Sequence, residues 1–310
     1  MLPNFLIIGA SRSGTTFLKK AVQQHPNIFM GGEGAYTGDI HFFNKSHPAK
    51  NWLKGLEWYE NFFSDRTTEK AVGEKSALYF DDPEAPKLIK QVLGKSVKLI
   101  AILRNPIERA YSSYWYQIED FPRGIKFLDA CKMERENRLR LKSFLHRPGF
   151  YNDHLTNYLK YFDGEKLLFI ILDFLKMDPL NGLRQVFRFL EIEENFIPEN
   201  YDKKVNQAIG EGGLTYGLKK SWGYIKQNYP NAYHLIKRLP PSKWLRIWLG
   251  KSSDKVAKNK SYPDMSAEEW HYLSELYYTN SKNMGKYLGI DLISLWHQPP
   301  DHLRYSEDKS

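Results

Sequence analysis

Residues 5–20, FLIIGASRSGTTFLKK, decide the fold of this chain. The apolar run Phe5–Ile8 predicts a short buried strand, because β-branched and aromatic residues fill it without alternation. A small, polar loop follows at residues 9–14, and Thr15 then opens a helical pattern. A strand, a glycine loop and a helix in this order aim backbone N–H groups and the positive end of a helix dipole at an anion.

The same loop carries further groups that suit a phosphate. Gly9 and Gly14 allow the backbone to approach an anion closely. The side-chain donors are the hydroxyls and the one guanidinium of Ser11, Arg12, Ser13, Thr15 and Thr16. Together with Gly14 these residues predict a phosphate cradle. The alternative interpretation is an ordinary strand-to-helix turn of an α/β protein.

The loop departs from that of nucleoside triphosphatases, G-x-x-x-x-G-K-[ST], at one position. Thr15 stands where those enzymes have the lysine that neutralises phosphates during phosphoryl transfer. The next strong strand, residues 97–103, is followed by Arg104 rather than by a metal-binding Asp. Both features disfavour a kinase or ATPase, and we expect no metal at the site.

A second phosphate contact is predicted just after that strand. Pro106 favours a helix start, and Ser112 lies about two helical turns beyond Arg104. A guanidinium at the carboxyl end of a strand and a hydroxyl on the adjoining helix can hold a phosphate together. Two separate contacts predict a nucleotide that carries phosphates at both ends.

Candidate catalytic groups lie between these two stretches. Asp39 and His41 follow a glycine-rich loop, and either could act as a general base. A capping Asp and a hydrogen-bonded core His are the alternative. Lys75, between Glu74 and Ser76, lies on a strand expected over Val72–Phe80, where a solvated edge is also possible.

With these residues in place, the chain resembles the sulfotransferases that use 3′-phosphoadenosine 5′-phosphosulfate (PAPS), most closely the heparan-sulfate branch and its bacterial relatives. The resemblance rests on GASRSGTT at 9–16, DIHFF at 39–43, GEKS at 73–76, RNPIERAYS at 104–112 and GFYNDHL at 149–155. The family usually has Lys where this chain has Arg12, and its heparan-sulfate branch usually has Glu where this chain has Asp39.

The resemblance implies a P-loop-like, three-layer α/β fold with a central, mainly parallel sheet flanked by helices. It implies one sulfotransferase domain over residues 1–310, with a nucleotide-binding core at 1–195 and a helical acceptor-side or lid region at 196–310. PAPS would be the sulfate donor and 3′-phosphoadenosine 5′-phosphate (PAP) the product. Arg12 would hold the sulfate, Asp39 would take the proton of the acceptor hydroxyl with His41 as helper or substitute, and Lys75 would orient the acid or contact the acceptor. The acceptor would be a carbohydrate, a glycolipid or another alcohol.

The excess of basic residues favours an acidic ligand but does not indicate which class of acidic ligand binds. The formal net charge is +9, and the single Cys131 excludes an intrachain disulfide. The basic residues are dispersed without a nucleic-acid motif, so we expect no nucleic-acid partner. An inactive nucleotide- or polyanion-binding protein remains the non-enzymatic alternative. We find no signal-like segment and no long apolar run, which predicts a cytoplasmic protein.

The carboxyl third is predicted to be helical. Residues 243–249 form a basic amphipathic segment that would either dock on the core or contact a membrane peripherally. The glycines at 210–213 mark a lid or a linker. Ser266 and Glu269 predict a capping box at the start of a helix that runs to Leu288. The oligomeric state is left open.

Overall fold

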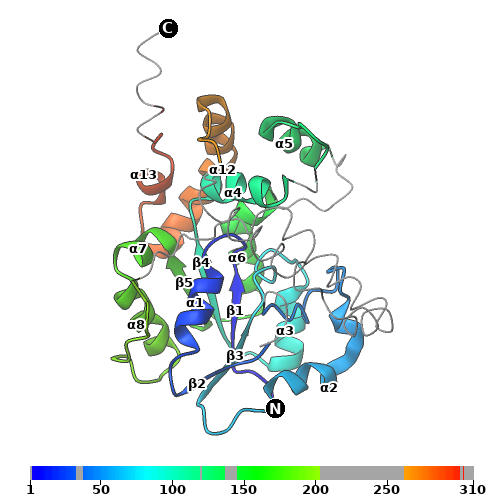
Figure 1. Ribbon diagram of the computed structural model, residues 1–310, viewed down its shortest axis with the longest axis vertical. Helices are drawn as coiled ribbons and strands as arrows, with labels where there is room; N and C mark the ends of the chain where they lie inside the picture. The colour runs from blue at the N-terminus through cyan, green and yellow to red at the C-terminus, as the bar shows by residue number, and fades with distance from the viewer. Residues whose placement is uncertain are drawn as a thin grey trace, which may run out of the picture. The chain divides into compact units, whose positions relative to one another are not determined.

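A parallel sheet with the strand order β2-β3-β1-β4-β5 lies at the centre of the computed structural model (Figure 1). The structure describes residues 2–32, 38–118, 121–136, 145–202, 262–300 and 303. The strands are β1 (Phe5–Gly9), β2 (Ile28–Met30), β3 (Ala71–Lys75), β4 (Lys98–Leu103) and β5 (Leu167–Ile171). All strand pairs are parallel, as expected for strands joined by helical crossovers.

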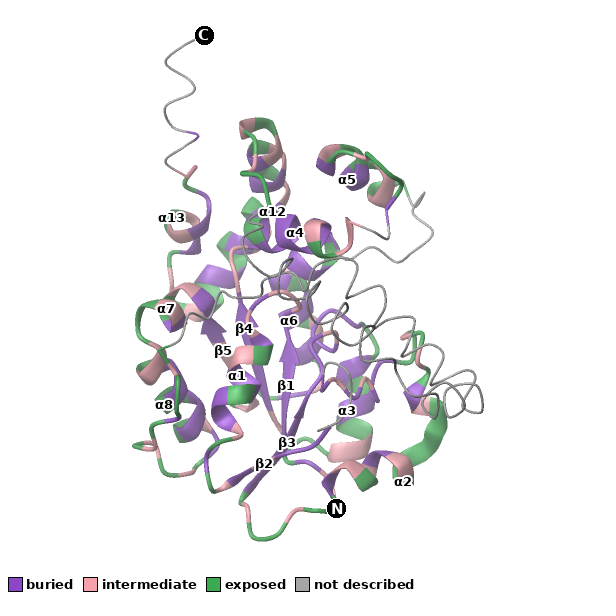
Figure 2. Ribbon diagram, in the orientation of Figure 1, coloured by how far each residue is buried: buried purple, intermediate pink, exposed green. Residues whose placement is uncertain are grey.

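Helices cover both faces of the sheet, and the strands bury side chains on each (Figure 2). On one face, Leu6 and Ile8 pack with α3 (Ala85–Leu93) and α6 (Tyr151–Leu159). On the other, Phe5 and Ile7 pack with α1 (Thr15–Val22), α7 (Leu172–Met177) and α8 (Pro179–Phe189). Because successive strand residues point to opposite faces, an unbroken apolar run such as Phe5–Ile8 serves both layers. The predicted three-layer α/β fold is confirmed.

A third apolar cluster lies beyond the sheet. It joins α4 (Pro106–Tyr116), α5 (Phe127–Arg135) and α12 (Ala267–Leu288). The short helix α13 (Leu292–Trp296) follows α12 and contributes Trp296 to the cluster under α3 and α6. The remaining elements are α2 (Gly55–Glu60) and the 3₁₀ turns Asn51–Lys54, Asn61–Phe63, Arg147–Gly149 and Gly164–Lys166.

Most predicted elements are confirmed, and one is too long. The Ser266–Glu269 capping box forms in full at the start of α12. The strand expected over Val72–Phe80 ends at Lys75, and a turn follows. The turn keeps two bonds to β1, from Ser76 N to Ile7 O at 3.0 Å and from Phe80 N to Ile8 O at 2.9 Å. The apolar residues after Lys75 are therefore buried by a turn against β1 rather than by a longer strand.

Nearly all described residues belong to one compact unit, made of residues 1–205 and 265–310. The predicted division at residue 195 stays a prediction, and the segments 210–213 and 243–249 lie outside the described residues. Across the described ranges, no helix combines the length and the apolar character needed to cross a membrane.

Candidate functional site

The candidate site lies at the carboxyl edge of the sheet. The strands β1, β3 and β4 are neighbours and parallel, so the loops that follow them meet at this edge. In Figure 1 these strand ends point toward α4 and α12. The chain passes from β1 to β2 and β3 on one side and then to β4 on the other, which makes β1 and β4 the point where the strand order reverses. Ligands of open α/β sheets bind at such a point.

The predicted phosphate cradle has the expected backbone geometry. Gly14 is the residue before α1 and has φ of 94°, a conformation that favours glycine. No side chain caps this helix, so its first N–H groups face the loop. A Cβ at Gly9 would lie 2.7 Å from Cβ of Phe80, which explains the need for glycine there. Ser13 and Thr15 are buried, while Thr16 is exposed.

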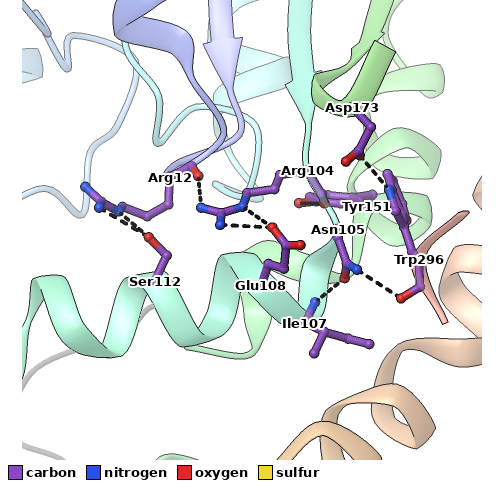
Figure 3. Close-up of polar contacts among 9 residues, drawn as sticks. All are labelled: Arg12, Arg104, Asn105, Ile107, Glu108, Ser112, Tyr151, Asp173 and Trp296. Atoms are coloured by element: carbon purple, nitrogen blue, oxygen red, sulfur yellow. Dashed lines mark hydrogen bonds and ion pairs between the residues drawn. The ribbon is translucent and has the colours of Figure 1, made fainter. Parts of the chain in front are cut away.

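The two predicted phosphate contacts lie side by side (Figure 3). The Nε and Nη2 atoms of Arg12 lie 3.4 and 3.3 Å from Ser112 Oγ, to which they donate. Arg104 Nη1 donates to the backbone oxygen of Arg12 at 3.4 Å. The structure therefore joins the loop, the end of β4 and helix α4 in one polar cluster.

Both cations of this cluster have partners from the chain itself. The Nε and Nη2 atoms of Arg104 donate to Glu108 Oε2 at 3.1 and 3.0 Å. The guanidinium of Arg12 also lies over the ring of Tyr116, 4.3 Å from its centroid. Its contacts with Ser112 and Tyr116 place the Arg12 side chain on α4, so the predicted role in holding a sulfate stays a prediction.

The turn between β4 and α4 is braced from the far end of the chain (Figure 3). Asn105 caps α4 through Ile107 N at 3.0 Å and donates from Nδ2 to the backbone oxygen of Trp296 at 2.9 Å. The Trp296 indole donates to Asp173 at 3.1 Å, and the hydroxyl of Tyr151 donates to Arg104 O at 2.8 Å. These contacts fix the backbone that carries Arg104.

The predicted catalytic residues form a second cluster at the end of β3. Lys75 Nζ makes an ion pair with Asp39 Oδ1, and both side chains are largely buried. A single parallel bridge pairs the backbones of Asp39 and Lys75. His41 Nε2 lies 3.8 Å from Asp39 Oδ2, and the rings of His41 and His47 stack with their centroids 4.0 Å apart. The structure thus brings Asp39, His41 and Lys75 together.

Burial sets the protonation of these groups. It raises the pKa of Asp39, although the charges of Lys75 and Lys19 act in the opposite direction. It lowers the pKa of His41 to about 4, with the charge of Lys75 adding to the effect. Burial also lowers the pKa of His47 to about 4. Both imidazoles are therefore neutral near pH 7, whereas burial strengthens Asp39 as a base.

Lys19 lies close to the Asp39 cluster and was missed by the sequence interpretation. It lies on α1, one turn after Thr15, and is buried. A Cβ added to Gly38 would lie 2.5 Å from Lys19 Nζ, so the ammonium fills the space beside the backbone that precedes Asp39. The i, i+4 spacing from Thr15 was the one available signal. It shows that both residues share a helix face but not what that face meets.

No group of three or more Asp, Glu, His or Cys side chains suited to a metal occurs among the residues the structure describes. The roles predicted for the loop residues, Arg104 and Ser112, and for Arg12, Asp39, His41 and Lys75 stay predictions.

Comparison with known proteins identifies the family. The family model described as "Sulfotransferase domain" matches residues 2–211. The chain therefore belongs to the sulfotransferase family.

Among curated proteins, the bifunctional heparan sulfate N-deacetylase/N-sulfotransferase 1 of Xenopus laevis is 29% identical over 299 residues, which cover 92% of this chain and 30% of that protein. The protein of the same name from Caenorhabditis elegans is 33% identical over 246 residues, covering 76% of this chain and 28% of that protein. The chain thus spans less than a third of the length of these relatives.

Solved structures agree on the fold. A sulfotransferase from Alicyclobacillus acidocaldarius superposes with a TM-score of 0.68 at 19% identity, covering 96% of this chain and 100% of that one. Mouse sulfotransferase SULT7A1, solved in complex with PAP, gives a TM-score of 0.50 at 15% identity, with 93% and 87% covered. At these identities the likeness shows the fold alone.

Proposed function

We propose that this protein transfers the sulfuryl group of PAPS to a hydroxyl or amine of an acceptor. One observation carries the proposal: Arg104 and Ser112 contact Arg12 of the cradle, so the residues that we expect to bind the two ends of the donor lie at one edge of the sheet. The acid–lysine pair Asp39–Lys75 lies at the neighbouring strand end. Membership of the sulfotransferase family supports the same conclusion.

The residues present suit the donor. The N-terminus of α1, with the loop residues Ser11, Ser13, Gly14, Thr15 and Thr16, would hold the 5′-phosphosulfate. Arg104 and Ser112 would hold the 3′-phosphate, with the guanidinium contributing two parallel hydrogen bonds. Their present partners, Glu108 and Arg12, would give way to the phosphate.

Asp39 would act as the general base. The donor supplies an electrophilic sulfur and a phosphate leaving group, and this chain must take a proton from the acceptor. Asp39 is suited because burial raises its pKa, which strengthens it as a base. His41, with a pKa of about 4, is a weak base and would instead orient the acceptor by a hydrogen bond.

The cations of the site would stabilise charge. Lys75 compensates the buried Asp39 and fixes the orientation of its carboxylate. Arg12, once released from Ser112, could reach the leaving phosphate oxygen, where negative charge builds during transfer. Arg keeps the positive charge of the family's usual Lys but presents it as a planar fork.

The acceptor we propose is a carbohydrate or another molecule with a hydroxyl or amine group. Support comes from the curated relatives, whose names describe heparan sulfate N-sulfotransferases. A lipid alcohol, a cytoplasmic location and peripheral membrane contact through residues 243–249 also stay proposals. No nucleic-acid partner is proposed.

The proposal is tested in two stages. Calorimetry should find PAP binding with ATP binding at least about tenfold weaker, because ATP lacks the 3′-phosphate. PAPS-dependent sulfation should then be measured on a panel that includes N-desulfated heparan sulfate, simple glycans and lipid alcohols. We expect Asp39→Asn to lose turnover by about 10²–10⁴-fold while it retains PAP binding.

Asp65→Asn, which changes an exposed aspartate, serves as the matched control and should keep full activity. Equal affinity for ATP and PAP would contradict the proposed donor. Tight PAP binding without turnover on any acceptor class would favour the binding-only alternative.

A further inference from the structure

Glu74 is a buried carboxyl that accepts hydrogen bonds from three hydroxyl groups. Its Oε2 accepts from Ser76 Oγ at 2.7 Å. Its Oε1 accepts from the hydroxyls of Tyr79 at 2.8 Å and Tyr59 at 3.3 Å. Glu74 and all three partners are fully buried. Burial raises its pKa to about 7, so keeping this carboxyl in place costs free energy that a hydroxyl network only partly offsets.

Ser76 connects this carboxyl to the segment that carries the proposed base. Its Oγ accepts from the backbone N–H groups of Ile40 at 3.0 Å and His41 at 2.9 Å. A serine hydroxyl has two lone pairs and one hydrogen. Because both lone pairs are in use, the hydrogen needs an acceptor, and Glu74 Oε2 is that acceptor.

The two tyrosines secure the rest of the segment. The hydroxyl of Tyr79 accepts from Phe43 N at 3.3 Å while it donates to Glu74. The ring of Tyr59 stacks on Phe42, with the centroids 4.4 Å apart, and meets Phe43 edge-on. Each of the amides of residues 40, 41 and 43 is therefore held by a hydroxyl that donates to Glu74.

The strand places Lys75 between these two anchors. Since successive side chains of a strand point to opposite faces, Glu74 and Ser76 share one face, while Lys75 points the other way to Asp39. In the tripeptide Glu74–Ser76, the two outer residues thus hold the backbone after Asp39, and Lys75 between them holds the carboxylate of Asp39.

We propose that Glu74, acting through Ser76, is a positioning residue of the reaction: it fixes the backbone of Ile40–Phe43 and thereby holds the Asp39 carboxylate against Lys75. The inference rests on the proposed function in so far as Asp39 is the base. In its ionised form Glu74 only accepts, which suits the three hydroxyls that donate to it. The amide of Gln would either present N–H groups to Ser76, whose lone pairs are occupied, or present them to the tyrosine hydroxyls.

The test compares three variants with a matched control. Ser76→Ala removes the acceptor for two amides, Glu74→Gln removes the acceptor for Ser76, and Ser76→Thr restores the hydroxyl. Ser274→Ala is the control, because it removes another buried serine, which lies in α12 away from this network. The Oγ of Ser274 forms a hydrogen bond of 2.9 Å with Nδ1 of His297. Each protein is first checked for folding and for PAP affinity by calorimetry.

Two measurements follow on the whole chain of 310 residues. Amide hydrogen exchange at Ile40 and His41 should be about tenfold or more faster in Ser76→Ala and Glu74→Gln, with exchange in β1 and β4 unchanged. Turnover of PAPS with N-desulfated heparan sulfate, or with the acceptor found in the panel, should fall about 10- to 100-fold in kcat while PAP affinity stays within about twofold, as expected for a misplaced base. Ser76→Thr should recover most of the kcat, and Ser274→Ala should retain all of it.

A third measurement separates this inference from the proposed function. The Asp39 carboxyl is titrated by carbon NMR in each protein. If Asp39 is released from Lys75, its pKa should rise further, because that cation lowers it. This result is expected even if no acceptor is found and the proposed function fails. Unchanged Asp39 titration and unchanged amide exchange in a folded Ser76→Ala protein would overturn the positioning role, as would loss of kcat only together with PAP binding.

Discussion

The two ends of the candidate site each carry an ion pair, and the two pairs differ in their exposure to solvent. At the α4 end, Arg104 pairs with Glu108, and their side chains are 18% and 49% exposed. At the β3 end, Lys75 pairs with Asp39, and their side chains are 3% and 10% exposed. The first pair lies at the surface and the second is withdrawn from water.

The two ends are therefore suited to different tasks. A solvent-exposed ion pair contributes little to stability, so a phosphate can replace Glu108 at small cost. A buried pair cannot be opened without leaving an uncompensated charge. The α4 end is therefore suited to exchanging its internal partners for those of a ligand, and the β3 end to keeping one geometry.

The largest expected effect concerns the buried pair. Lys75→Met should lower the free energy of unfolding by about 3–5 kcal/mol, because Asp39 would remain buried without its cation. Turnover should fall by about 10²–10⁴-fold. Chemical denaturation and steady-state kinetics measure the two effects. The control is Lys98→Met, which breaks the pair of Lys98 with the exposed Glu191 and should cost about 1 kcal/mol or less.

A substitution at the exposed α4 end should change the affinity for PAP rather than the free energy of unfolding. Arg104→Gln should weaken PAP binding by about 10- to 100-fold, since charge-assisted hydrogen bonds contribute about 1.5–3 kcal/mol. AMP, which lacks the 3′-phosphate, should bind the variant and the wild type alike. Calorimetry with both nucleotides checks this, and equal losses for PAP and AMP would place the 3′-phosphate elsewhere.

The pH dependence of the free energy of unfolding should reflect the titration of the buried Glu74 carboxyl. The pKa of Glu74 is raised by burial to about 7, so the folded protein holds this proton more tightly than the unfolded chain. The stability from this group is complete below its ordinary pKa, near 4.5, and is lost as the pH rises through about 7. As the pH rises through this window, the wild type should lose stability that the Glu74→Gln variant does not lose. The ratio of the two unfolding equilibrium constants should therefore shift in favour of the variant by roughly tenfold or more. Denaturation at pH 5 and pH 8 measures the difference, and a constant difference would contradict the expectation.

The smallest effect is expected at Glu108. Glu108→Gln should tighten PAP binding by about two- to fivefold, because it removes the carboxylate that competes with the 3′-phosphate for Arg104. Salt should shrink the gain, since the pair is exposed. Titrations at low and high ionic strength test this. A loss of affinity would mean that Glu108 orients Arg104 for the ligand instead of competing with it.

The sequence allowed us to predict elements formed by neighbouring residues, but not contacts between residues far apart in the chain. The strand, loop and helix of residues 5–20 and the capping box of α12 follow from neighbouring residues, and both are confirmed. The contact of Asn105 with Trp296 joins residues 191 positions apart, and no local pattern announces it. The burial of Lys19 beside Gly38 likewise depends on how a helix meets a loop.

The error at β3 has the same origin. The apolar residues that follow Lys75 suggested a longer strand, but they are buried because a turn folds them against β1. The position of Glu74 on the strand was evident from the sequence. Its three hydroxyl partners were not, because Tyr59 reaches it from a helix fifteen residues earlier.

A crystal structure of the protein with PAP would test whether one edge of the sheet binds both ends of the donor. We predict the 5′-phosphate at the loop of residues 9–16 and the 3′-phosphate on Arg104 and Ser112, with Glu108 and Arg12 displaced from those groups and Asp39 still against Lys75. A nucleotide whose 3′-phosphate lies away from Arg104 and Ser112, while those two keep their present partners, would show that this edge does not bind the donor as proposed.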